Sequence, residues 1–176
     1  KDYGSFILTS MNQGMRDQLA YAGFDVQAVN SNIKFSTVAF DTSEGPSLPS
    51  NLKGGETGYY VVQFIGPISE DWKADVQGKG ARLFNAVNNN AFIMKMSPSA
   101  KNAVGALPYV NWIGNYEPAY KLADGIGTSG VISLDVRTFN GEDFNTVLGQ
   151  IKGLGASVRY TTPSDTWANS IVLDIA

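Results

Sequence analysis

Two pairs of adjacent carboxylates come closer than any other residues in this chain to a catalytic arrangement. Glu70 is followed by Asp71, and Glu142 by Asp143, and paired carboxylates can act as general acid and base. Each pair, however, falls where a helix is expected to begin, and carboxylates in a first turn face the positive end of the helix dipole. We therefore interpret both pairs as helix-start signals. We expect no catalytic residues, and we expect that this segment is not an enzyme.

The 176-residue sequence contains no histidine and no cysteine. Ser-His-Asp and Cys-His arrangements therefore cannot be built from it, and disulfides are excluded. Zinc, copper and haem lose their usual ligands. The glycine-rich residues 125–130 do not join a strand directly to a helix as a phosphate-binding loop does, and Asp124, Asp135 and Asp174 lack the spacing of a calcium loop. The sequence predicts no metal site and no cofactor.

The overall composition indicates which kinds of partner and surroundings the chain is suited to. A net charge of −3 without a basic stripe predicts no nucleic-acid binding. No apolar run approaches the roughly 20 residues of a membrane span. An apolar fraction of 43% is enough for a folded core, and the charged fraction of only 16% is weakly typical of extracellular proteins. No signal peptide is recognisable in the sequence.

Residues 58–122 contain the clearest elements, in the order strand, helix, strand, strand, helix, strand. Ser69 and Ser97 are helix caps, and Pro98 suits a first helical position. Asn88–Asn90 tolerate the left-handed conformation of a tight turn. The strands are expected at residues 59–64, 81–87, 91–96 and 109–116. This order predicts a ferredoxin-like plait, an α+β fold with both helices on one face of an antiparallel sheet.

A second, incomplete plait is expected at residues 131–176, after a linker at 123–130. Its expected elements are a strand at 131–137, a helix capped by Asn140, and strands at 156–161 and 167–175. The buried stripe of that helix is expected to be Phe144, Leu148, Ile151 and Leu154. The second helix and fourth strand are missing, so they come from a continuation of the chain, from residues 10–41, or through self-association of this unit. Alternation in its strands predicts one polar sheet face, open to solvent or a partner.

Residues 1–57 are expected to form an N-terminal helix and strand segment followed by a linker. We expect a helix over residues 10–22 and strands over 24–29 and 33–40. Met11, Met15, Leu19 and Ala22 lie on one helical stripe, which is typical of core. Residues 42–57 form the linker. Two prolines stiffen it, and Leu48 and Leu52 can anchor it along a neighbouring domain.

The strands of the central unit predict apolar residues on both sheet faces. One face carries Tyr60, Val62, Phe64 and Met94, and the other carries Tyr59, Val61, Phe84 and Ile93. The helices cover one face, so the other is either an interface or is covered by residues 1–41 or by the second unit. The candidate protein-interface residues are Tyr59, Val61, Tyr116, Tyr120 and Asp165.

Four motifs within residues 33–122 carry a family resemblance. They are FDTSEGPSLPSNLK, GYYVVQFIGPI, NNAFIMKM and LPYVNWIGNYEPAYKL. Together they resemble the N-terminal pro-region of secreted subtilisin-like serine proteases of bacteria and archaea. The resemblance implies a propeptide, secreted with a serine protease domain downstream, that acts as intramolecular chaperone and temporary inhibitor. It also implies that a sheet face docks on the subtilisin-like catalytic domain, with Asp165 near the N-termini of two partner helices.

Two other function classes stay open. One is a non-enzymatic extracellular or cell-surface protein-interaction domain built from the same repeats. The other is a regulatory plait that binds a small molecule, although no convergent polar pocket is recognisable in the sequence.

Overall fold

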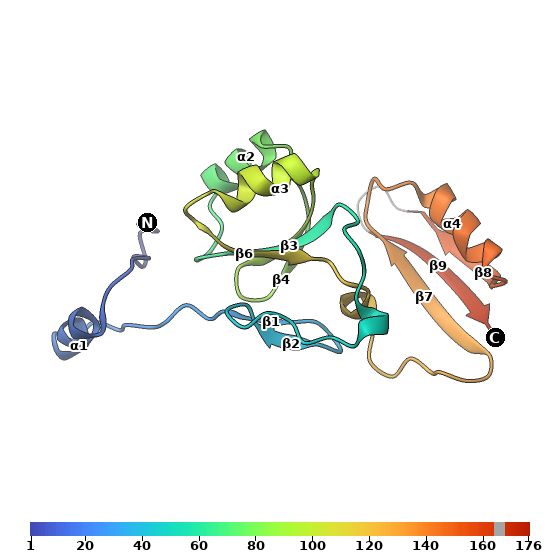
Figure 1. Ribbon diagram of the computed structural model, residues 1–176, viewed down its shortest axis with the longest axis horizontal. Coiled ribbons are helices and arrows are strands. Elements are labelled where there is room, and N and C mark those ends of the chain that lie inside the picture. Colours follow the sequence, from blue (N-terminus) through green and yellow to red (C-terminus); the bar gives the residue numbers. More distant parts are fainter. Residues whose placement is uncertain (164–167) are drawn as a thin grey trace. The chain divides into compact units, whose positions relative to one another are not determined.

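The protein has a mixed α+β architecture with antiparallel sheets (Figure 1), here described from a computed structural model over residues 1–163 and 168–176. The chain divides into two compact units, Lys1–Ala119 and Tyr120–Ala176. None of the helices in the described ranges has the length and apolar character needed to cross a bilayer.

A four-stranded antiparallel sheet with the strand order β4-β5-β3-β6 lies at the centre of the first unit. Two helices, α2 and α3, lie on one face of it (Figure 1). The elements are β3 (Tyr59–Phe64), α2 (Glu70–Gly78), β4 (Arg82–Val87), β5 (Ala91–Lys95), α3 (Pro98–Gly105) and β6 (Val110–Asn115). Each element expected from the sequence in this region is confirmed.

Local signals explain where these elements begin. The Ser69 hydroxyl accepts a hydrogen bond from the Trp72 amide at the start of α2, over 3.5 Å. Ser97 accepts from the Ala100 amide over 3.2 Å, with Pro98 at the first position of α3. Between β4 and β5 the chain turns through Asn89 and Asn90, whose φ angles are 52° and 62°. Asparagine adopts this left-handed conformation more readily than other residues with a side chain.

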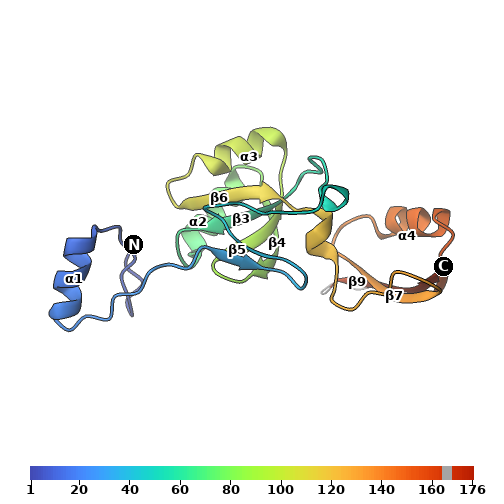
Figure 2. The same cartoon turned by 60° about the horizontal axis from the view of Figure 1, so that its bottom comes forward.

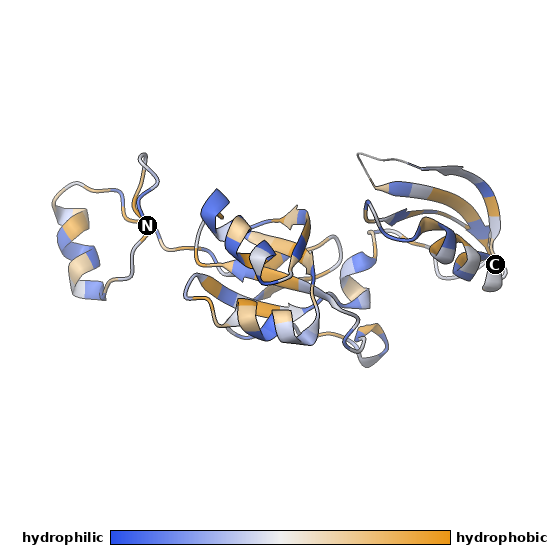
Figure 3. Cartoon of the chain, turned by 90° about the horizontal axis from the view of Figure 1, so that it is seen from above, coloured by the Kyte–Doolittle hydropathy of each residue, from blue (hydrophilic) through white to orange (hydrophobic). Residues whose placement is uncertain are grey.

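The main core lies between the sheet and its helices. From β3 it takes Tyr60, Val62 and Phe64, and it also includes Trp72, Val76, Met94 and Val104. Hydrophobic residues are concentrated along the strands of this unit in Figure 3. The expected apolar face of Tyr60, Val62, Phe64 and Met94 is therefore the one that packs under α2 and α3.

A β-hairpin covers the opposite face of the same sheet. Its strands β1 (Asn32–Lys34) and β2 (Ala39–Asp41) pair antiparallel, and the Phe35 amide donates to the Val38 carbonyl across the turn. Ile33 is fully buried and Phe40 is 8% exposed. The hairpin and the two helices lie on opposite sides of the sheet (Figure 1; Figure 2 gives a second view), so this unit has three layers.

This hairpin corrects three expectations for residues 24–41. Residues 33–40 are not one strand, because the chain reverses between Phe35 and Val38. Residues 24–29 form no strand, since they lack a neighbouring strand with which to pair. The hairpin also does not complete the second unit, because it is held by the sheet of the first.

Helix α1 (Gln13–Tyr21) differs from its expected form. It is capped by Asn12, whose side chain accepts from the Met15 amide over 2.9 Å, and so it begins later than residue 10. None of its residues is buried, and Met15 is 49% exposed. The expectation that its apolar stripe is core was wrong, because an amphipathic pattern identifies a face but not an element that packs against it.

The linker at residues 42–57 is fastened to the first unit at several points. Leu48 and Leu52 are half-buried, and Leu52 is the last residue of a short 3-10 helix, η1 (Ser50–Leu52). The Gly54 amide donates to a Glu117 carboxylate oxygen over 2.6 Å. Glu56 accepts from the Tyr60 hydroxyl and lies 3.4 Å from the Lys101 ammonium.

The second unit begins within the short 3-10 helix η2 (Pro118–Lys121) and has a three-stranded antiparallel sheet in the order β7-β9-β8. Its elements are β7 (Ile132–Thr138), α4 (Phe144–Gly153), β8 (Ser157–Thr162) and β9 (Asn169–Ile175). Ile171 and Leu173 of β9 are buried. Hydrophobic and hydrophilic residues alternate along these strands (Figure 3).

Two details of α4 differ from the sequence-based expectation. Asp143, not Asn140, is the cap, and its carboxylate accepts from the Thr146 amide over 3.1 Å. Gly141 has a φ of 74°, a left-handed conformation that separates Asn140 from the helix. The expected buried stripe is only half-buried at Phe144, Leu148 and Ile151. Leu154 is 75% exposed, because the helix has ended at Gly153.

Candidate protein-interaction surface

The expected interface residues Tyr59 and Tyr116 lie side by side in the first unit. The Tyr116 amide donates to the Tyr59 carbonyl over 2.9 Å. The Tyr59 ring stacks on Phe84 at 6.1 Å, and the Lys95 ammonium lies 5.1 Å from its centroid. Tyr116 packs against Phe35 of the hairpin turn, and burial raises the pKa of its phenol. Both side chains are half-buried.

Val61 and Tyr120 do not lie on an open surface. Val61 has 0% exposure and Tyr120 has 5%. Val61 belongs to the sheet face that the β1–β2 hairpin covers, so its side chain serves the interior of the first unit. The alternation of the strand predicted its face correctly, and of the alternatives left open for that face the structure has cover by residues of the 1–41 segment. Asp165 lies outside the described residues.

Polar contacts, as well as apolar ones, hold the hairpin on the sheet. The buried Gln63 side chain accepts from the Thr42 hydroxyl over 2.7 Å and from the Asn111 amide over 2.9 Å. It donates to the Ser31 and Asn89 carbonyls over 3.3 and 3.1 Å. Four hydrogen bonds therefore satisfy this amide inside the protein, as a buried polar group requires.

The second unit presents a polar sheet face on the side away from its buried Ile171 and Leu173. Its exposed residues are Ser133, Asp135, Arg137, Arg159 and Tyr160. Tyr160 is 60% exposed and lies opposite Val172, which lies opposite Asp135 in turn. A row of tyrosine, valine and aspartate thus crosses the middle of a face bordered by charged residues.

Two hydrogen-bonded clusters fix the charged side chains of this face. In the first, Asp174 accepts from the Ser133 hydroxyl and from Arg159 Nε, both over 2.6 Å. In the second, Asp135 accepts from the Ser170 hydroxyl over 2.5 Å and from Arg137 Nε over 3.0 Å. The serine hydroxyls, followed by the arginines, hold the pKa values of both carboxyls below their usual range. The face therefore carries ionised carboxylates already paired with cations.

This arrangement suits binding better than catalysis. A general acid or base needs a pKa near the working pH, whereas the pKa values of both aspartates are shifted away from neutrality. A face with an exposed tyrosine and hydrogen-bonded arginines has residue types that are enriched in protein interfaces. The alternating pattern of 131–137 predicted a polar face here, but Arg159 was missed because a bulge breaks the alternation of β8.

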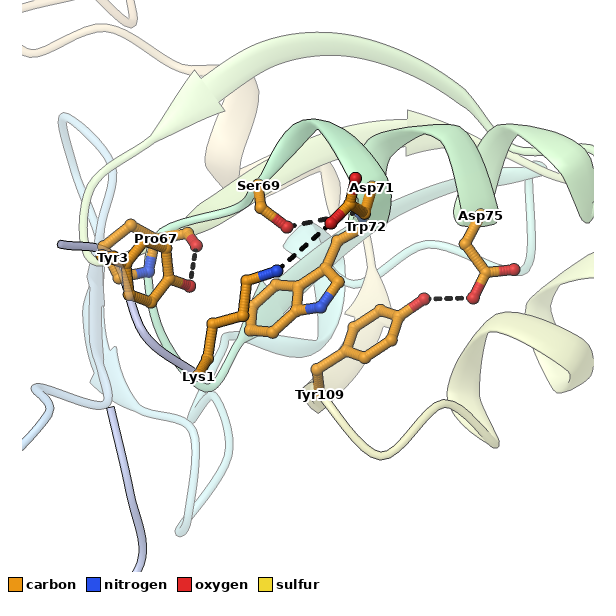
Figure 4. Close-up of polar contacts among 8 residues, drawn as sticks. All are labelled: Lys1, Tyr3, Pro67, Ser69, Asp71, Trp72, Asp75 and Tyr109. Carbon is orange, nitrogen blue, oxygen red and sulfur yellow. Dashed lines mark hydrogen bonds and ion pairs between the residues drawn. The ribbon is translucent and has the colours of Figure 1, made fainter. Parts of the chain in front are cut away.

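The carboxylate pair at the start of α2 is structural, and Figure 4 shows the surroundings of its second member, Asp71. Glu70 and Asp71 lie in the first turn, as expected, and Asp71 faces the Lys1 ammonium at 3.3 Å. The rings of Trp72 and Tyr109 stack 4.5 Å apart, and the Tyr109 hydroxyl donates to Asp75. The contacts of Tyr109 join α2 to the segment that leads into β6.

The second pair, Glu142 and Asp143, is also accounted for by the start of a helix, since Asp143 caps α4. In the described ranges, no three Asp or Glu side chains are grouped so that they could hold a metal ion.

Comparison with known proteins gives a family but no function. No curated protein and no solved structure matches the chain. A family described as "Domain of unknown function (DUF8729)" matches residues 18–117. The match begins in α1 and ends after β6, so it includes the hairpin together with the sheet that it covers. Because this match spans more than half of the sequence, the chain belongs to the DUF8729 family.

Proposed function

We propose that this chain is the propeptide-like module of a secreted subtilisin-type protease, acting as intramolecular chaperone and temporary inhibitor. In this proposal the second unit docks its polar sheet face on the catalytic domain, and the first unit lies outboard. The catalytic residues belong to the protease domain and not to this chain.

The strand topology supports the fold that this proposal requires. A ferredoxin-like plait has the order strand, helix, strand, strand, helix, strand, and the first unit runs β3-α2-β4-β5-α3-β6. Its strand pairs are all antiparallel, and β3 and β5 are central. The second unit runs β7-α4-β8-β9 with β9 central, which corresponds to the first part of the same order. We therefore propose tandem plaits of which the second is incomplete.

The availability of the helix-free sheet face is the observation that carries the proposal. In the first unit the β1–β2 hairpin covers that face, and Val61, Gln63 and Ile93 on it are buried. In the second unit the equivalent face leaves Tyr160 60% exposed. A module that binds through a sheet face would therefore use β7, β9 and β8.

The chemistry of this face fits a protein partner. Tyr160 supplies a large apolar surface with a polar tip, as residues at the centre of interfaces often do. Arg159 and Arg137 are held in place before binding by Asp174 and Asp135, which reduces the entropy lost when a partner docks. The resemblance of residues 33–122 to subtilisin pro-regions supports a protease as that partner.

The proposal is tested by titrating the full chain into a subtilisin-type protease and following hydrolysis of a chromogenic peptide. We expect stoichiometric inhibition by the wild-type chain. Tyr160→Ala should raise the inhibition constant by about tenfold or more, because the tyrosine occupies the middle of the face. The matched control is Tyr21→Ala, which removes a tyrosine that is 97% exposed on α1 and should leave inhibition unchanged.

Two outcomes of this titration would contradict parts of the proposal. Equal inhibition by wild type and Tyr160→Ala would move the docking site off this face. A folded wild-type chain that fails to inhibit any subtilisin-type protease tested, and fails to speed refolding of the denatured catalytic domain, would contradict the protease role. The chain would then be better described as an extracellular interaction domain.

A further inference from the structure

We propose that two copies of this chain associate by pairing strand β7 antiparallel with β7 of the second copy, forming one continuous sheet around a two-fold axis. This inference rests on the edge of the second sheet and not on the protease proposal. The pairing leaves Tyr160 and Arg159 of the polar face exposed, while Asp135 and Arg137 belong to both surfaces.

Strand β7 has the properties of an edge that accepts another strand. It is the outer strand in the order β7-β9-β8, and in the described residues its other side has no paired strand. It runs for 7 residues with an unbroken register against β9 and contains neither glycine nor proline. Long, regular edges of this kind are templates for pairing with another chain.

The opposite edge of the sheet is protected in a way that β7 is not. The register of β8 against β9 shifts between Val158 and Tyr160, which marks a bulge. A bulge twists an edge strand and disrupts the regular row of hydrogen-bonding groups. Association is therefore expected at β7 and not at β8.

The charges of β7 identify a second copy as the partner. Asp135 and Arg137 are next-but-one neighbours on the same sheet face. When the strand is paired antiparallel with itself about Val136, Asp135 lies opposite the partner's Arg137, and the reverse pair forms by symmetry. Opposite charges directly across an antiparallel pair are favourable, whereas the register centred on Asp135 would place two aspartates together. Arg137 can make this contact because its side chain is 73% exposed and guanidinium has several donors.

The apolar residues of the strand agree with the same register. Val136 and Leu134 point to the opposite face and are half-buried. In the paired sheet Val136 lies against the partner's Val136, and Leu134 lies against the partner's Thr138. A two-fold axis perpendicular to the sheet keeps both copies of α4 on one side. The pairing thus supplies a neighbour for β7, which is an outer strand in the described residues.

Charge reversal gives a specific test by sedimentation of the full chain. We expect the wild type to sediment at twice the chain mass of 18.9 kDa as its concentration rises. Asp135→Arg places only arginines across the pair, and Arg137→Asp places only aspartates, so each variant alone should remain monomeric. Mixed in equal amounts, the two variants should form a heterodimer, because every facing pair is then again opposite in charge. The double variant Asp135→Arg/Arg137→Asp should dimerise like the wild type.

The controls separate pairing from folding. Arg16→Asp, on α1, makes the same change in net charge as Arg137→Asp but away from β7, and should leave the dimer intact. Circular dichroism of each variant checks that it is folded, and heterodimer formation requires both single variants to be folded. A wild type that stays at 18.9 kDa up to about 1 mM overturns the proposal. So does a dimer that survives each single reversal.

Discussion

The Thr42 hydroxyl donates a hydrogen bond of 2.7 Å to the Gln63 side-chain carbonyl inside the first unit, where Gln63 is 1% exposed. This contact joins the residue that follows β2 to the middle of the central sheet. It lies within the set of four hydrogen bonds that Gln63 makes to the hairpin, to the Asn89 turn and to Asn111.

Replacing Gln63 with leucine should therefore destabilise the first unit by about 2–3 kcal/mol, because several buried partners lose their hydrogen bonds together. Thr42→Val should cost less, about 1 kcal/mol, since Gln63 would still accept from Asn111. Urea unfolding of the full chain measures both changes. Gln77→Leu, an exposed position on α2, is the matched control and should change stability little. Equal stability of Gln63→Leu and wild type would contradict a structural role for this amide.

A second expectation concerns the turn between β4 and β5. Asn90 has a φ of 62°, so Asn90→Val should destabilise by about 1–2 kcal/mol, the cost of placing a β-branched side chain in the left-handed region. Asn90→Gly should be neutral or slightly stabilising. Ala86→Val, at an exposed and regularly paired position of strand β4, provides the control because valine suits an extended strand. The urea midpoints of these variants rank their stabilities directly. Equal midpoints for Asn90→Val and Asn90→Gly would show that the left-handed backbone at position 90 causes no strain.

A third expectation concerns stability in alkali. Burial, and then the hydrogen bond to Asp75, raises the pKa of Tyr109 from 10.0 to about 12. A raised folded-state pKa contributes stability that is complete below pH 10 and is lost as the pH rises through 12. The free energy of unfolding should therefore decline over that interval, and less steeply in Tyr109→Phe.

Tyr60 adds a second group of the same kind, because burial and Glu56 also raise its pKa to about 12. The decline in Tyr109→Phe should consequently be reduced but not abolished. Urea unfolding at a series of alkaline pH values gives the profile, with Tyr21→Phe as a control expected to follow the wild type. If the free energy of unfolding declined equally steeply with pH in Tyr109→Phe and wild type, the folded state would not raise the pKa of this phenol.

A fourth expectation concerns the extent of the folding unit. A fragment of residues 30–119 should unfold cooperatively at a higher urea concentration than one of residues 58–119. The shorter fragment lacks the hairpin and the linker at residues 42–57. Val61 and Ile93, which are buried in the full chain, then become exposed to water, and the contacts of Glu56 are lost. Similar midpoints for the two fragments would mean that the hairpin adds no stability.

The sequence was most informative where local signals and hydrophobic pattern agreed. The strands of the first unit alternate or are continuously apolar, and serine caps mark the starts of both helices. The asparagines of the turn also indicated their own backbone conformation. These features depend only on neighbouring residues, so a single sequence contains them.

Long-range packing was the part that the sequence did not reveal. The stripe of Met11 and Met15 has the spacing of a core helix, yet no residue of α1 is buried. Val61 was placed on the correct sheet face, but the covering hairpin depends on contacts between residues more than twenty positions apart, such as Thr42 and Gln63. The candidate surface on the second unit was predicted as a polar face. Arg159 was not predicted to lie on this face, because a bulge in β8 breaks the alternation of the strand.

The bulge in β8 also limits how far this protein could assemble. A sheet that can extend at both edges grows without end, because every added copy presents a fresh edge to the next. Here one edge is used in the proposed dimer and the other is interrupted between Val158 and Tyr160. Addition of a third copy would have to begin on an irregular strand. The irregularity therefore limits self-association to a closed pair and disfavours a fibril, even at high local concentration.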